Sequence, residues 1–228
     1  MTRIGDSLKG KRVLITQADV FMGPALCEAF AAHGATVLAD TRAMDGAAAG
    51  EAAVREAGEV HVLIANLGVP APSTRVTEVS DAEWREVFAH IVDPMPGLFR
   101  PALAQMTARR SGKIVVMGSA TAFRGQKRTS TYSAARGAQV SYVRAVGAEV
   151  APSNVQVNLI AQNFVESPMY YGPQVQALPA FQERLKREVP VGRLGTAQED
   201  ALFAVFLASS EIGFFAGQSI PFAGGWVS

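Results

Sequence analysis

The 228-residue sequence has few of the side chains that bind metals or form disulfides. It contains one cysteine, Cys27, and three histidines, His33, His61 and His90. A single cysteine excludes an internal disulfide framework and a thiolate metal site. The histidines stand far apart in the sequence, with no carboxylate at a spacing typical of metal ligands. We therefore predict no metal site.

An excess of one charge and a long apolar run are also missing. The 21 lysines and arginines oppose 20 aspartates and glutamates, which leaves a net charge of +1. This balance predicts no basic surface for nucleic acid or for an anionic membrane. No apolar run reaches the roughly 18 residues that span a bilayer, and the first residues lack the apolar segment of a signal peptide. We expect a cytoplasmic protein that binds neither nucleic acid nor a membrane.

What the sequence does have is an alternation of short apolar runs and longer segments of helical period, with 49% hydrophobic residues. Strands are expected at 12–16, 36–40, 60–65, 113–117, 155–160 and 218–222. Helices are expected from residue 23, at 43–57, at 84–109 with a break near Pro94 and Pro96, at 130–151 and at 198–209. This order predicts an α/β fold, a doubly wound parallel sheet with helices on both faces. We expect one domain over residues 1–228, with a loop-rich cap at about 162–190.

Three side chains stand where such a fold binds its ligands, at the carboxyl ends of the strands. Ser119 follows the strand at 113–117, and Tyr132 and Arg136 lie one helical turn apart at the start of the next helix. A tyrosine in water has a pKa near about 10 and is a poor base at neutral pH. A fixed cation within about 4–6 Å favours the phenolate, and a guanidinium is permanently charged. The trio therefore indicates a tyrosine base with a serine hydrogen-bond donor.

The pattern from Ser119 to Tyr132-Ser-Ala-Ala-Arg136 resembles the catalytic signature of the short-chain dehydrogenase/reductase superfamily, which has lysine where this chain has Arg136. The resemblance implies a Rossmann-like fold. It is supported by five further landmarks in the same order: Arg12-Val-Leu-Ile-Thr16, Asn158-Leu-Ile-Ala161, Pro190-Val-Gly-Arg193, Phe206-Leu-Ala-Ser209 and Gly224-Gly225.

The loop after the first strand departs from that superfamily. Where the superfamily has Thr-Gly-x-x-x-Gly-x-Gly, this chain has side chains at Gln17 and Phe21 and keeps only Gly23. Those glycines let the backbone approach a pyrophosphate closely. The superfamily's catalytic asparagine aligns with Ile91, and its Ala-Pro-Gly after the fifth strand reads Ala161-Gln-Asn163. We therefore predict that no nucleotide cofactor is bound.

Among superfamily members, these departures resemble the halohydrin dehalogenases. The resemblance implies cofactor-independent conversion of vicinal haloalcohols into epoxides with release of halide. It also implies the reverse opening of epoxides by azide, cyanide or nitrite, and a homotetramer. Catalysis is then assigned to Ser119, Tyr132 and Arg136. The expected halide site comprises Phe21, Gln162, Asn163, Phe164 and Val165, and the expected substrate pocket Thr121, Phe123, Tyr170, Tyr171 and Trp226.

Two other interpretations remain open at this point. One is an NAD(P)-dependent short-chain carbonyl reductase with a degenerate glycine loop, against which Gln17 and Phe21 argue. The other is a non-catalytic scaffold of the same fold, against which the intact Ser119, Tyr132 and Arg136 argue.

Overall fold

The computed structural model describes residues 3–227 and contains one six-stranded sheet with the order β2-β1-β3-β4-β5-β6. Every neighbouring pair is parallel. The strands β3 and β4 are buried along their whole length, and β5 is buried up to its last residue, because both faces of the sheet are covered. This confirms the doubly wound parallel sheet. The strands are β1 Arg12–Ile15, β2 Thr36–Ala39, β3 Val62–Asn66, β4 Gly112–Ser119, β5 Val155–Gln162 and β6 Ser219–Phe222.

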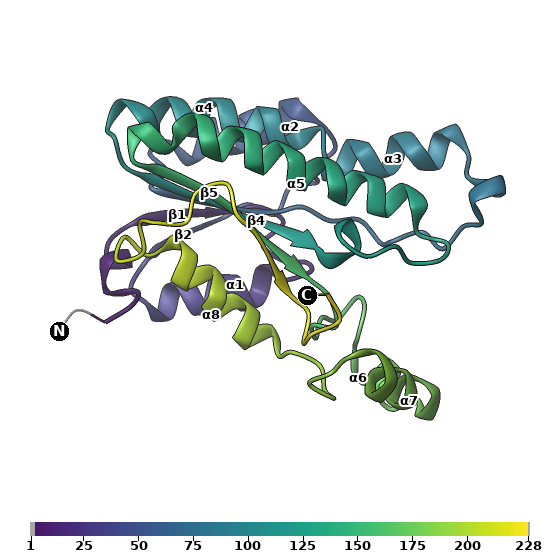
Figure 1. Cartoon of the computed structure of the whole chain (residues 1–228). Coiled ribbons are helices and arrows are strands. Elements are labelled where there is room, and N and C mark those ends of the chain that lie inside the picture. The colour runs from purple at the N-terminus through teal and green to yellow at the C-terminus, as the bar shows by residue number, and fades with distance from the viewer. Residues whose placement is uncertain (1–2, 228) are drawn as a thin grey trace.

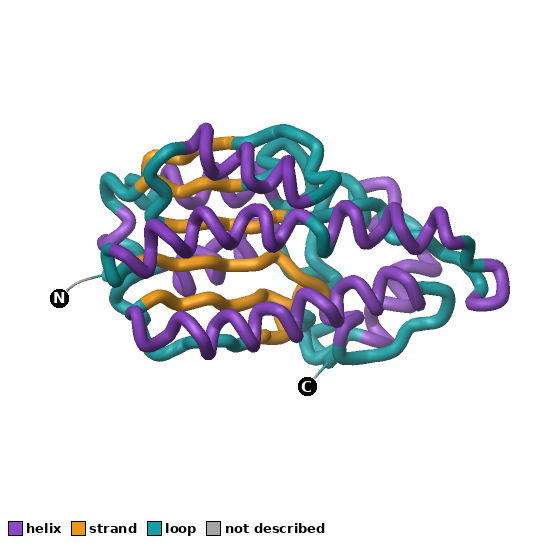
Figure 2. Tube along the Cα trace, turned by 90° about the horizontal axis from the view of Figure 1, so that it is seen from above, coloured by secondary structure: helices purple, strands orange, loops and turns teal. Residues whose placement is uncertain are grey.

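Helices form a layer on each face of the sheet (Figure 1). The helices α2, α4 and α5 cover one face, and α1 and α8 cover the other, each over its own hydrophobic cluster. Viewed from above, the upper helices run along the strands, and α3 projects beyond the ends of the strands (Figure 2). The helices are α1 Gly23–Ala32, α2 Ala47–Ala57, α3 Asp81–Ile91, α4 Pro94–Ala108, α5 Ser130–Val150, α6 Pro173–Gln176, α7 Pro179–Glu188 and α8 Ala197–Ala208.

The long helix expected at 84–109 is two helices, separated at Val92 and Asp93. Pro94 lacks the N–H that a continuous helix would need and lies in the first turn of α4, where proline is tolerated. The first helix also begins before residue 84, because the Ser80 hydroxyl accepts a hydrogen bond from the N–H of Glu83. The break near Pro94 is therefore confirmed, but it separates two helices instead of kinking one.

The segment at 162–190 was expected to be rich in loops, and it contains α6 and α7. Pro173 and Pro179 do not interrupt these helices, because each lies in a first turn, where proline is tolerated. The helix α7 packs against the site loop after β5 through Phe181 and Leu185. The cap lies below the carboxyl ends of the strands, near the C-terminus (Figure 1).

The helices α2 and α4 pack backbone to backbone at a glycine, Gly97. A Cβ atom on Gly97 of α4 would collide with the backbone carbonyl oxygen of Ala47 in α2. Gly137, inside α5, has nothing within 4 Å of the same position. We expect Gly97→Ala to cost about 1–3 kcal/mol of unfolding free energy by overpacking. Gly137→Ala should instead add up to about 1 kcal/mol through helix propensity.

Urea unfolding of the two variants checks this pair of predictions. Similar midpoints for both variants would show that α2 and α4 are not packed backbone to backbone at Gly97.

In the described part of the chain, no helix is both long and apolar enough to cross a membrane.

Candidate active site

A cavity of about 290 Å³ opens at the carboxyl ends of the strands. Its wall is formed by residues that follow β1, β3, β4 and β5, by the start of α5 and by the cap. This is where parallel α/β sheets bind their ligands. The predicted site residues that line it are Phe21, Ser119, Thr121, Tyr132, Arg136, Gln162, Asn163, Phe164, Val165, Tyr170 and Tyr171.

Ser119 is the last residue of β4, which extends two residues beyond the predicted strand. Its side chain is buried, and its Oγ accepts a hydrogen bond from the N–H of Thr121 at 3.3 Å. Thr121 Oγ1 lies 3.0 Å from the same oxygen. Thr121 can therefore act as a donor to Ser119, which leaves the serine proton available for a ligand in the cavity.

Tyr132 and Arg136 are one turn apart on α5, and both are buried. The Arg136 guanidinium carbon lies 5.0 Å from the centre of the Tyr132 ring. One guanidinium nitrogen, Nη1, donates to the Met117 carbonyl at 3.1 Å and to the Gln139 side chain at 2.9 Å. No aspartate or glutamate is among the cavity-lining residues, so the charge of Arg136 has no carboxylate partner there. Such a site stabilises negative charge on Tyr132 or on a bound ligand.

The loop after β5 also lines the cavity. Asn163 Oδ1 accepts hydrogen bonds from the Phe164 N–H at 2.9 Å and from the Tyr171 hydroxyl at 3.3 Å. The Phe164 N–H is therefore already bonded to Asn163 in this structure, while Phe164 lines the cavity. With its oxygen so engaged, the Asn163 amide group is a donor that this loop can offer to an anion.

The cap contributes two tyrosines to the cavity. The Tyr170 hydroxyl donates to the Val69 carbonyl at 2.8 Å, and the ring stacks on Phe21 with the centres 6.2 Å apart. Burial raises the pKa of Tyr170, and the neighbouring Tyr132 raises it further. Burial also raises the pKa of Tyr171. In this structure both cap phenols donate hydrogen bonds, Tyr170 to the Val69 carbonyl and Tyr171 to Asn163 Oδ1.

The loop after β1 is filled by side chains where a dinucleotide would need space. The Gln17 side chain is buried and bonds to Gly68, accepting from its N–H at 2.8 Å and donating to its carbonyl at 3.3 Å. The Phe21 ring lies over Gly68 so closely that a Cβ atom on that glycine would sit 2.8 Å from it. Backbone N–H groups at a glycine-rich turn are what a pyrophosphate requires. These residues do not fit that group.

Asp40, the residue after β2, is paired with Arg42 at 2.7 Å. Arg42 in turn pairs with Glu56 at 2.6 Å. Asp40 therefore belongs to a local ion-pair network beside β2. In residues 3–227, no group of three or more histidine, cysteine or acidic side chains is placed to hold a metal ion.

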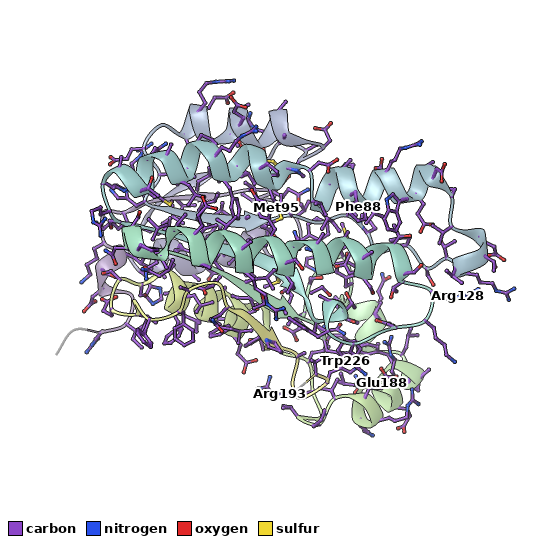
Figure 3. The ribbon with its side chains drawn as sticks, turned by 45° about the horizontal axis from the view of Figure 1, so that its top comes forward. Phe88, Met95, Arg128, Glu188, Arg193 and Trp226 are labelled. Atoms are coloured by element: carbon purple, nitrogen blue, oxygen red, sulfur yellow. The ribbon has the colours of Figure 1, made fainter. Side chains whose placement is uncertain are left out.

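Two predicted pocket residues lie outside the cavity. Phe123 is 37% exposed, and its ring lies 6.0 Å from the guanidinium of Arg144. Trp226 is buried beside the cap helix α7 (Figure 3) and contacts Phe164 from behind, with ring centres 6.0 Å apart. Trp226 therefore packs against the loop of residues 162–165 and is not among the residues that line this cavity. Sequence position alone cannot tell which side of that loop an aromatic ring occupies.

The sequence prediction missed several lining residues. They follow β3, precede α5 or lie in the cap: Asn66, Leu67, Ala71, Pro72, Ser73, Gln126, Lys127, Thr129 and Ser167. The residues at the end of β3 could have been predicted from the sequence, because any residue at the carboxyl end of a central strand is a candidate for ligand binding. The others come from loops whose paths depend on tertiary contacts.

The parallel sheet, together with a serine at the end of β4 and a tyrosine and a basic residue one turn apart on the next helix, defines a short-chain dehydrogenase/reductase class of protein. A family model described as enoyl-(acyl carrier protein) reductase matches residues 9–227. The chain belongs to this family, within the short-chain dehydrogenase/reductase superfamily.

Individual relatives differ in their described activities. The chain is 28% identical to 3-oxoacyl-(acyl-carrier-protein) reductase FabG of Escherichia coli K12, covering 96% of this chain and 98% of that protein. A solved structure described as a dehalogenation enzyme has 28% identity and a TM-score of 0.89, covering 97% of this chain and all of the other. A halohydrin dehalogenase bound to ethyl (2S)-oxiran-2-ylacetate has 24% identity and a TM-score of 0.85, covering 94% of this chain and 96% of the other, and shares the fold.

Proposed function

We propose that the protein converts vicinal haloalcohols into epoxides and halide without a nucleotide, and opens epoxides with small anions in the reverse direction. The observation that carries the proposal is the pairing of a buried Ser119, Tyr132 and Arg136 with a first loop filled by Gln17 and Phe21. The three buried side chains provide a base, and the side chains of the first loop fill the space that a nucleotide cofactor would need. Similarity to a solved structure described as a dehalogenation enzyme supports the same interpretation.

In the proposed reaction, the Tyr132 phenolate takes the proton of the substrate hydroxyl, while Ser119 donates a hydrogen bond to that oxygen. The oxygen attacks the neighbouring carbon, so that a C–O bond forms as the C–halogen bond breaks. The halide leaves with the bonding electron pair, and Tyr132 later returns its proton to solvent. The Arg136 guanidinium, 5.0 Å from the ring centre, stabilises the phenolate between turnovers.

The departing halide is proposed to bind between Phe21 and the loop of residues 162–165. Displacement at carbon is in line, so the leaving group and the attacking oxygen lie on opposite sides. The Asn163 amide supplies a hydrogen-bond donor, and Phe21 excludes water from a weakly hydrated anion.

The second candidate function is an NAD(P)-dependent reductase, favoured by the 28% identity to FabG over almost the whole chain. The side chains at Gln17 and Phe21 oppose it, because the loop does not fit a pyrophosphate.

Bromide release from a simple vicinal bromoalcohol, with no nucleotide added, separates the two candidates. We expect stoichiometric bromide and epoxide, together with no NADH or NADPH binding by fluorescence titration. Nucleotide binding with carbonyl reduction and no bromide release would overturn the proposal in favour of the reductase.

Two substitutions at Asn163 test the halide site. Asn163→Asp keeps the oxygen that accepts from Tyr171 and Phe164 but replaces the amide donor with negative charge. We expect Asn163→Ala to weaken bromide binding about tenfold, the effect of losing one hydrogen bond to a charged group. Asn163→Asp should weaken it more, through like-charge repulsion. Bromide inhibition of azide-dependent epoxide opening measures both, and equal inhibition of the wild type and the Asp variant would place the anion elsewhere.

A further inference from the structure

Gln139 is a fully buried amide in the middle of α5, three residues after Arg136. Its Oε1 accepts from Arg136 Nη1 at 2.9 Å, and its Nε2 donates to the Ile91 carbonyl at 2.8 Å. A buried amide is costly unless both of its ends are satisfied. Both ends of the Gln139 amide are hydrogen-bonded, and its oxygen contacts the Arg136 guanidinium beside Tyr132, the proposed base.

The Ile91 carbonyl is available to Gln139 because of the break between α3 and α4. In a continuous helix, the N–H of Met95 would bond to this carbonyl, but it bonds to Val92 instead. Pro94, just before Met95, has no N–H to offer. The break therefore leaves an unpaired carbonyl at the end of α3, which anchors Gln139 in one orientation.

Arg136 is held through one nitrogen of its buried guanidinium group, Nη1, which donates to two oxygens. The carbonyl of Met117, near the end of β4, is the first, and the oriented oxygen of Gln139 is the second. Neither carries a formal charge. An amide and a carbonyl can fix a guanidinium in place without cancelling its charge, whereas a carboxylate at the same place would pair with it.

We propose that Gln139 is a positioning residue that holds the Arg136 guanidinium against the Tyr132 ring while leaving its positive charge uncompensated. The inference rests on the proposed function for the role of Tyr132 as the base. Gln139 contributes nothing to the chemistry directly, since it bonds to Arg136 and Ile91 and does not line the cavity.

Other titratable groups also face this part of the cavity. Tyr170 and Tyr171 approach from the cap, and Lys127 approaches from the loop before α5. On the α3 side, Glu83 accepts hydrogen bonds from Thr131 and Thr74 outside the cavity lining. These groups are unchanged in the variants below, so a difference between variants reports on position 139.

The test compares Gln139→Glu, Gln139→Leu and a control, Val143→Ala, which removes buried volume one turn further along α5 without touching Arg136. Tyrosinate formation is followed by ultraviolet difference absorbance without substrate. Each variant is also made with Tyr132→Phe, to isolate the contribution of Tyr132 from those of the other three tyrosines. The pH dependence of bromide release is measured in parallel.

We expect the Tyr132 transition to move up by about one pH unit or more in Gln139→Glu, because the carboxylate pairs with Arg136. Gln139→Leu should move it less, and Val143→Ala not at all. The rising part of the pH profile for bromide release should shift to higher pH by the same amount. At neutral pH, kcat/KM should fall about tenfold for each pH unit by which the Tyr132 transition moves.

The inference would be overturned if both Gln139 variants lost stability while the Tyr132 transition stayed at the same pH. Gln139 would then be a packing residue. The absorbance measurement needs no turnover. If the transition shifts but no variant releases bromide, the proposed function fails while the role of Gln139 stands.

Discussion

Replacing Tyr132 with phenylalanine should lower the rate of haloalcohol dehalogenation by a factor of about 10³, the scale of a lost general base. The ring would still pack on Val87 and Ala135 and beneath Arg136, so folding should be intact. Bromide binding should also be unchanged, since the proposed anion site is built from Phe21 and residues 162–165 and not from Tyr132. Initial rates of bromide release at saturating substrate measure the effect.

Tyr142→Phe is the matched control. It removes the same atom from the same helix, but Tyr142 packs against Phe99 outside the cavity. We expect full activity from this variant. If Tyr132→Phe retained more than a few per cent of the rate, the proton acceptor would be another group, and Tyr170→Phe would then be the variant to measure.

Replacing Asp200 with leucine should stabilise the protein above pH 7. Asp200 lies in the first turn of α8 with its side chain fully buried, and neither carboxylate oxygen has a hydrogen-bond partner in residues 3–227. Burial raises the pKa of Asp200 from its ordinary value of 3.8 to about 7. This change in pKa corresponds to roughly 4 kcal/mol of lost unfolding free energy at pH 8.

The sign of the pH dependence follows from proton binding. Below about pH 4 the carboxyl is protonated in both states and costs little. Between about pH 4 and 7 the unfolded chain releases this proton while the folded chain keeps it, so stability falls as the pH rises. Above about pH 7 the folded protein holds a buried, unpaired charge, and the full cost remains.

Thermal unfolding at pH 5 and pH 8 checks this prediction. We expect Asp200→Leu to raise the Tm at pH 8 by about 10 °C and by less at pH 5. Asp200→Asn should show the same trend with a smaller gain, because it leaves a buried polar group. Asp45→Asn, an exposed carboxylate, should change neither value. An equal effect of Asp200→Leu at both pH values would mean that the carboxylate is not buried as a charge.

Local sequence patterns predicted much of the candidate site. Ser119 could be placed because an apolar run ended just before it, and the carboxyl ends of parallel strands meet at one edge. Tyr132 and Arg136 could be placed on one face because residues four apart on a helix are neighbours. Phe21 could be linked to the same edge because it follows the first strand. Each of these inferences needs only local periodicity and the rules of parallel sheets.

The sequence by itself therefore determined the layered fold and the serine, tyrosine and arginine at its ligand-binding edge, because helix and strand periods are local properties. The positions of side chains that depend on long-range contacts were decided only by the tertiary structure. Trp226 packs against Phe164 in the loop of residues 162–165, and Gln139 reaches Arg136 because a helix break frees the Ile91 carbonyl. In sequence, Asp200 is an ordinary acidic residue in a helix's first turn, where the helix dipole favours it. The packing of α8 against α1 and the sheet buries it, and no local pattern specifies that environment.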